Sequence, residues 1–168
     1  ETIAYYLDPR NFLNSNSIFM FLNLSYDSKF HTLDGIKTIL NGTFMSNKTI
    51  DNTTMTYADA FLAIAKETGV NPYFLAARVI QEQGSGGTSP LISGTYSGYI
   101  GYYNFYNIGA YGSTTAATIT SGLSYAKDKG WNSIYKALKG GATFIGGSYI
   151  GVGQDTLYLQ KWHVIPVS

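Results

Sequence analysis

The sequence predicts a mainly α-helical (α+β) domain with one irregular or β lobe inserted between its helices. After residue 56, apolar residues recur at spacings of three and four, which is the period of an amphipathic helix. Glycines follow several of these segments, as left-handed residues commonly do at the ends of helices. The stretch 84–104 breaks this pattern, because it combines Gly and Ser with tyrosines. We expect one domain over 1–168, since a chain of this size buries about 70% of its unfolded surface.

Residues 1–55 are expected to form an irregular N-terminal part that packs on the helical domain. Within it, only 33–40 has a helical pattern. The first long helix is expected to begin after Thr56, whose hydroxyl can cap it, and to end before Gly69.

A second long helix is expected to begin after Asn71 and to continue to Gln83. At 100° per residue, Leu75, Val79 and Glu82 lie within about 60° of one another around its axis. The carboxylate therefore shares a stripe with two apolar residues. Because the other sides of the helix are also largely apolar, we expect it to be central and buried.

Residues 84–104 are too long for an ordinary connection, and they predict a mobile functional lobe, irregular or with a hairpin. The helical pattern resumes after the lobe. We expect helices at 115–129, 131–138, 142–149 and 155–161.

Composition excludes several classes of function. Without cysteine, the chain cannot be a disulfide scaffold, a zinc finger, an iron–sulfur protein or a thiol enzyme. A net charge of +1 is too small to indicate nucleic acid binding, and no apolar run approaches the ~20 residues of a membrane span. His31 and His163 lie 132 positions apart, and no carboxylate lies beside His163, so we expect no metal and no cofactor.

Only 12% of the residues are charged while 15% are aromatic, so uncharged polar residues must form much of the surface. Tyrosine offers a flat apolar face and a hydrogen-bonding hydroxyl, which suits neutral, hydroxyl-rich ligands such as glycans. Core packing is the alternative role for these rings. Of the 15 tyrosines, six fall within 96–111, which favours binding for that group.

Glu82 is the carboxylate best placed to act as a general acid. The macrodipole at a helix C-terminus and burial on an apolar stripe both disfavour a negative charge. Both effects favour the protonated form that a general acid requires. A side chain that simply reaches solvent is the alternative. Arg78, one turn earlier, could pair with a carboxylate or neighbour the site.

Four segments carry a resemblance to a known family: Tyr5–Leu13, Gln81–Gly84, Tyr103–Ala110 and Gly153–Lys161. In this order they resemble the bacterial endo-β-N-acetylglucosaminidases of glycoside hydrolase family 73, which are peptidoglycan-cleaving autolysin domains. The similarity spans nearly the whole chain. It implies a lysozyme-like helical domain with a small flexible lobe over the active-site cleft.

The resemblance also implies hydrolysis of the β-1,4 bond between N-acetylglucosamine and N-acetylmuramic acid. Glu82 matches the catalytic glutamate of the family, and Tyr158 matches its late tyrosine. The substrate-binding residues that we expect are Gln83, Tyr96, Tyr99, Tyr103, Phe105, Tyr106, Asn107 and Gln154.

One departure bears on mechanism: no Asp or Glu occurs between Glu82 and Asp128, where some family members have a second catalytic carboxylate. We therefore expect substrate-assisted catalysis, in which the 2-acetamido group attacks the anomeric carbon. A muramidase or lytic transglycosylase, and a non-catalytic glycan-binding module, are the alternatives.

The expected partners are peptidoglycan glycan strands. Such a substrate implies a domain secreted to the bacterial cell wall. We expect it to be a monomeric part of a longer protein with cell-wall-binding modules.

Overall fold

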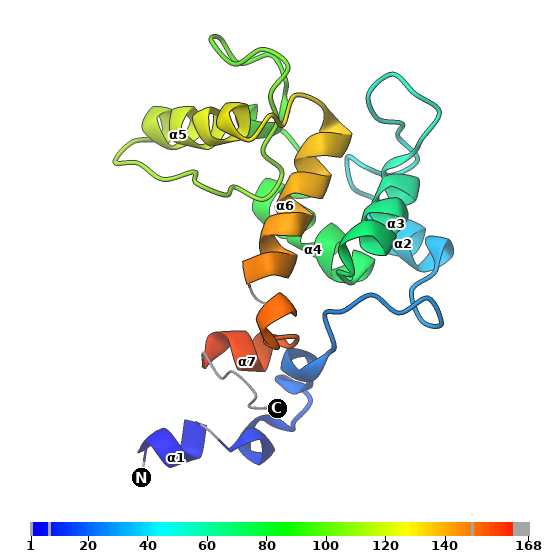
Figure 1. Cartoon of the computed structure of the whole chain (residues 1–168), viewed down its shortest axis with the longest axis vertical. Coiled ribbons are helices and arrows are strands. Elements are labelled where there is room, and N and C mark those ends of the chain that lie inside the picture. The colour runs from blue at the N-terminus through cyan, green and yellow to red at the C-terminus, as the bar shows by residue number, and fades with distance from the viewer. Residues whose placement is uncertain (1, 7, 149, 163–168) are drawn as a thin grey trace.

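The computed structural model describes residues 2–6, 8–148 and 150–162, and this part of the chain is mainly helical (Figure 1). Its α-helices are α1 (Thr2–Tyr6), α2 (Leu33–Leu40), α3 (Tyr57–Thr68), α4 (Pro72–Gln83), α5 (Thr115–Asp128), α6 (Ile134–Ser148) and α7 (Leu157–Lys161). Short 3₁₀ helices lie between them: η1 (Pro9–Phe12), η2 (Ile18–Phe21), η3 (Pro90–Ile92) and η4 (Ile150–Val152). The mainly α class is confirmed.

Helices α2, α3 and α4 pack on one another, and α6 packs along α3. Figure 1 shows α6 near the middle of the molecule, α5 to one side, and α1 and α7 toward the same end. In the described ranges, no helix combines the length and apolar character that crossing a membrane requires.

The starts and stops of α3 and α4 are those that the sequence predicts. Thr56 Oγ1 accepts a hydrogen bond from the Asp59 amide, and the Asp59 carboxylate accepts one from the Thr56 amide, so the pair forms a capping box. Gly69 ends α3 with φ +72°, a conformation that glycine adopts without steric cost. At the start of α4, the Asn71 side chain accepts from the amides of residues 73 and 74.

The N-terminal part contains α2 at the predicted 33–40, within otherwise irregular chain. Backbone hydrogen bonds fasten it to the domain. The Asn71 amide donates to Leu24 O at 2.7 Å, and the Leu24 amide donates to Asp155 O at 2.8 Å. The backbone of Leu24 therefore binds both the start of α4 and the segment before α7.

Of the two alternatives for residues 84–104, the structure has the irregular one, and the hairpin is wrong. Apart from η3, the described chain there consists of turns without any strand. Its glycines repeatedly adopt positive φ, including +70° at Gly84, +67° at Gly94 and +81° at Gly101. A backbone that reverses so often cannot keep the extended conformation that a β-ladder needs.

The prediction of separate helices at 131–138 and 142–149 is also wrong, because α6 runs without interruption from 134 to 148. Gly140 and Gly141 lie inside it and have a packing role. A Cβ at Gly140 would meet the Trp131 indole nitrogen, and one at Gly141 would meet the Tyr106 ring. These glycines therefore allow two large rings to lie directly on the helix backbone.

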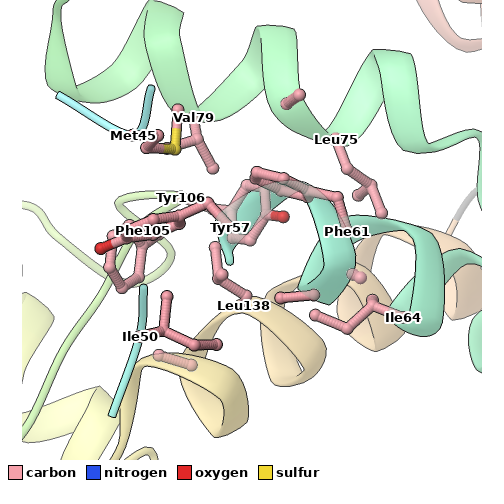
Figure 2. Packing of buried hydrophobic residues seen from close by; sticks show 14 of the residues in the cluster. Met45, Ile50, Tyr57, Phe61, Ile64, Leu75, Val79, Phe105, Tyr106 and Leu138 are labelled. Atoms are coloured by element: carbon pink, nitrogen blue, oxygen red, sulfur yellow. The ribbon is translucent and has the colours of Figure 1, made fainter. Parts of the chain in front are cut away.

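The core lies between α2, α3, α4 and α6, and the loop 104–107 inserts two aromatic rings into it. Figure 2 shows Phe105 and Tyr106 beside Tyr57 of α3 and Leu138 of α6. Phe105 is 1% exposed, and its ring centroid lies 6.2 Å from that of Tyr57. The loop is thus anchored from inside the domain, which fixes its position next to the end of α4.

Gly141→Ala is expected to destabilise the domain by about 1–2 kcal/mol, because overpacking against Tyr106 outweighs the better helix propensity of alanine. Gly147→Ala is the matched control. It lies in the same helix with open space around its Cβ position, so we expect up to about 1 kcal/mol of stabilisation. Urea unfolding of both variants measures the difference. Equal stabilisation by the two substitutions would refute the close contact at Gly141.

Candidate active site around Glu82

Glu82 lies in the last turn of α4, as the sequence predicts. Leu75 and Val79 on the same stripe are fully buried, whereas the Glu82 side chain is 23% exposed. The helix ends at Gly84, whose φ of +70° turns the chain into the lobe. The carboxylate is therefore mounted on a rigid, buried helix and retains access to solvent.

Two hydrogen-bond donors hold the Glu82 carboxylate, one on each oxygen. Arg78 Nη2 lies 2.9 Å from Oε1 in an i,i+4 ion pair, which confirms the predicted proximity of this arginine. Asn107 Nδ2 donates to Oε2 at 3.0 Å. The carboxylate that the sequence places on an apolar stripe is thus also in contact with a cation and an amide.

Asn107 has an unusual backbone, with φ +53° in the left-handed region. Asparagine adopts this conformation more readily than most other residues with a side chain, because its short polar side chain can hydrogen-bond nearby. Here the side chain donates to Glu82 and accepts from Gln83 Nε2 at 2.8 Å.

Gln83 belongs to the interior of the site. Its side chain is 7% exposed, and besides Asn107 its Nε2 donates to the backbone oxygens of Asn104 at 3.3 Å and Phe105 at 2.9 Å. The end of α4 and the loop 104–107 are therefore joined by one buried amide.

Asn104 is a site residue that the sequence reasoning missed. It is fully buried, and its Nδ2 donates to Ile108 O at 2.8 Å and Gly122 O at 2.9 Å. Its Oδ1 accepts from the Ile108 amide at 3.2 Å. These bonds close the turn that carries Asn107 and tie it to α5. The motif at 103–110 pointed to this region. Nothing in the sequence, however, indicates that Asn104 is the buried amide and Asn107 the one that faces Glu82.

The aromatic residues of the same motif lie at different depths. Tyr103 is half-buried and stacks on Phe105 with a centroid distance of 6.3 Å. Phe105 and Tyr106 are core residues, and burial raises the pKa of the Tyr106 phenol well above its ordinary value. Tyr106 therefore stays neutral and supports the loop from inside, while Tyr103 is the more accessible ring.

Tyr96 and Tyr99 lie in the lobe, half-buried. The Lys127 ammonium lies 6.0 Å from the centre of the Tyr99 ring, which ties this part of the lobe to α5.

Tyr158 lies in α7, and Gln154 lies just before this helix. Tyr158 is 6% exposed, stacks on Phe21 at 4.9 Å, and donates through its hydroxyl to Tyr6 O at 3.2 Å. Gln154 is buried, and its backbone oxygen accepts from Gln160. Tyr158 thus joins the N-terminal part to α7. Their predicted roles in catalysis and binding stay predictions.

Most other carboxylates of the described chain have structural partners. Asp51 accepts from the amides of Ile134 and Tyr135 and so caps α6, while Asp59 caps α3. Glu67 pairs with Lys139 at 2.6 Å. Within the described ranges, no group of three or more His, Cys, Asp or Glu residues could hold a metal ion.

Comparisons with known proteins identify the family of the chain. The chain is 35% identical over 167 residues to a beta-N-acetylglucosaminidase of Bacillus subtilis, a match that covers 96% of the chain. Its structure superposes on that of S. aureus glucosaminidase B with a TM-score of 0.71 and 31% identity, covering 96% of this chain and 60% of the other. The chain belongs to the glucosaminidase family of bacterial autolysins, family 73 of the glycoside hydrolases.

A further member of this glucosaminidase family is S. aureus autolysin E, crystallised as a catalytic glutamate-to-alanine mutant in complex with the disaccharide NAG-NAM. That structure matches with a TM-score of 0.58 and 28% identity, covering 89% of this chain and 66% of the other. No model of a protein family matches the sequence. The chain spans less than a fifth of the length of the curated relatives, 18% of the B. subtilis protein. The lysozyme-like architecture expected from the motifs is that of these structural neighbours.

Proposed function

We propose that this domain hydrolyses the β-1,4 bond between N-acetylglucosamine and N-acetylmuramic acid in peptidoglycan, with Glu82 as the general acid. The observation that carries the proposal is the placement of Glu82. It is a partly exposed carboxylate on a buried helix, oriented by Asn107 from a loop that is anchored in the core. Preorganised placement of this kind is what proton transfer to a leaving group needs.

The relatives support this assignment. Autolysin E binds the disaccharide NAG-NAM when its catalytic glutamate is replaced by alanine, and other relatives are named for glucosaminidase activity. We propose that this chain binds the same disaccharide unit and likewise uses a catalytic glutamate.

In the first step, the protonated Glu82 donates its proton to the glycosidic oxygen. The 2-acetamido oxygen of the same sugar bonds to the anomeric carbon, and the electrons of the breaking C–O bond pass to the leaving oxygen. An oxazolinium intermediate and a free hydroxyl on the leaving sugar result. In the second step, water attacks the anomeric carbon and the bond from that carbon to the acetamido oxygen breaks, which restores the acetamido group. The Glu82 carboxylate takes a proton from the attacking water.

The carboxylates of the chain support the use of a substrate nucleophile. Asp51, Asp59 and Glu67 are engaged in helix caps and an ion pair, and the lobe sequence contains none. A retaining enzyme with its own nucleophile would need a second carboxyl group about 5.5 Å from Glu82.

A tyrosine hydroxyl would hold the acetamido group. Tyr158 and Tyr103 are the residues that we propose for this role, with Tyr96 and Tyr99 as rings on which sugars stack. Tyr158→Phe separates two functions of its hydroxyl. A fall in kcat at unchanged stability supports contact with substrate, and a fall in the melting temperature alone assigns the hydroxyl to its bond with Tyr6 O.

Mass spectrometry of digested, reduced peptidoglycan tests the proposed function. New reducing ends of N-acetylglucosamine are the expected product. Reducing muramic acid would indicate a muramidase, and the 1,6-anhydro form a lytic transglycosylase. Intact strands with measurable binding would indicate a glycan-binding module. On the proposed function, the domain acts at the bacterial cell wall after secretion, as part of a longer protein that carries wall-binding modules.

A further inference from the structure

Gln83 follows the general acid directly in the chain, yet its amide is buried and faces two backbone oxygens, those of Asn104 and Phe105. A backbone carbonyl can only accept a hydrogen bond, so the Gln83 atom that faces it must be Nε2. The other amide atom, Oε1, is then buried without a hydrogen-bond partner among the described residues. An unpaired buried acceptor is unfavourable, so the two carbonyls hold the amide in this orientation despite that cost.

The orientation of Gln83 fixes that of Asn107. Because Nε2 can only donate, Asn107 must present its Oδ1 to Gln83, at 2.8 Å. Its Nδ2 is then directed to Glu82, where it donates to Oε2 at 3.0 Å and to the backbone oxygen at 3.3 Å. The carbonyls of Asn104 and Phe105, acting through Gln83, and the carbonyl of Glu82 itself thereby require the Asn107 amide nitrogen to face the catalytic carboxyl.

This arrangement makes the two Glu82 oxygens chemically different. In a neutral carboxyl group, the carbonyl oxygen is a better acceptor than the hydroxyl oxygen. A donor fixed on Oε2 therefore keeps Oε2 as the carbonyl and leaves the proton on Oε1. Oε1 is now paired with Arg78 at 2.9 Å, so the guanidinium must leave before that proton is in place.

We propose that Gln83 is a positioning residue that acts through Asn107 to keep the transferable proton of Glu82 on Oε1. The proposal rests on the proposed function, which it deepens. It also gives Gln83 a role other than the substrate contact expected from the sequence. Gln83 affects the chemical step, and the Michaelis constant depends on other residues.

A double-mutant cycle with Gln83→Met and Asn107→Ala tests the proposal, with kcat and KM measured on purified peptidoglycan strands. We expect Gln83→Met to lower kcat about 10- to 100-fold, because only part of the general-acid contribution to the rate is lost. KM should stay within about threefold of the wild-type value. The double variant should be no slower than Asn107→Ala alone, within about twofold, since coupled residues are not additive. Additive losses, or a rise in KM at unchanged kcat, would overturn the proposal.

Thr143→Val is the matched control, because it also removes a side-chain donor to a backbone carbonyl, Lys139 O at 2.9 Å, within α6 and outside the proposed site. Its kcat should equal that of wild type. If Gln83→Met fails to fold, hydrogen exchange of the wild-type Asn107 side chain decides. We expect its Nδ2 protons to be protected, and exchange at the rate of a free amide would contradict the proposal. A wild-type domain that produces no N-acetylglucosamine ends would instead refute the proposed function itself.

Discussion

Glu82→Gln is expected to lower kcat on peptidoglycan by about 10²- to 10⁴-fold, the range that a general acid contributes. Glutamine fills the same space but cannot donate a comparable proton to the leaving oxygen. Loss of the partly exposed Arg78 ion pair should change the free energy of unfolding by less than about 1 kcal/mol. The fall in activity would therefore be chemical rather than structural.

Release of reducing ends, measured beside the thermal unfolding midpoint, checks this prediction. Glu67→Gln is the matched control. It makes the same substitution at a carboxylate that pairs with Lys139, away from Glu82, and we expect its activity to be unchanged. A Glu82→Gln variant that retained more than a tenth of wild-type activity would exclude this residue as the acid.

Asn104→Leu is expected to have the largest effect on stability, at least about 3 kcal/mol. The substitution removes three hydrogen bonds and leaves the Ile108 amide and two carbonyl oxygens buried without their partner. The turn that carries Asn107 would loosen, so activity should fall further than the loss of folded protein explains.

Urea unfolding and kcat at a temperature where the variant is folded measure both effects. Asn132→Leu is the control, because Asn132 is exposed and its Oδ1 accepts a hydrogen bond from Lys136 Nζ at 2.9 Å, away from the turn. A loss below about 1 kcal/mol in Asn104→Leu would show that the turn is held by other contacts.

Local signals allowed much of the helical frame to be predicted. The caps at Thr56 and Asn71 and the stop at Gly69 act within one turn of chain, so the sequence around them is enough. Glu82 could be placed on the stripe of Leu75 and Val79 for the same reason, since helical periodicity determines which residues share a face.

The errors have a different origin, in contacts between residues far apart in the chain. Gly140 and Gly141 look like a helix stop until Trp131 and Tyr106 are seen to lie on them. The Gln83–Asn107 pair joins residues 24 positions apart, and no local pattern indicates which amide faces the catalytic carboxylate. Tyr158 likewise packs against Phe21, so its surroundings depend on how the two ends of the described chain meet.

The most direct test of the proposed mechanism is an NMR experiment during hydrolysis of soluble peptidoglycan strands. It measures the anomeric proton signals of the new reducing end over time. Attack by the acetamido oxygen and then by water each inverts the anomeric carbon, so the configuration is retained overall. We predict that the first product carries a reducing N-acetylglucosamine in the β form, which later equilibrates with the α form. Initial appearance of the α form, or of reducing muramic acid, would contradict catalysis by Glu82 with assistance from the substrate.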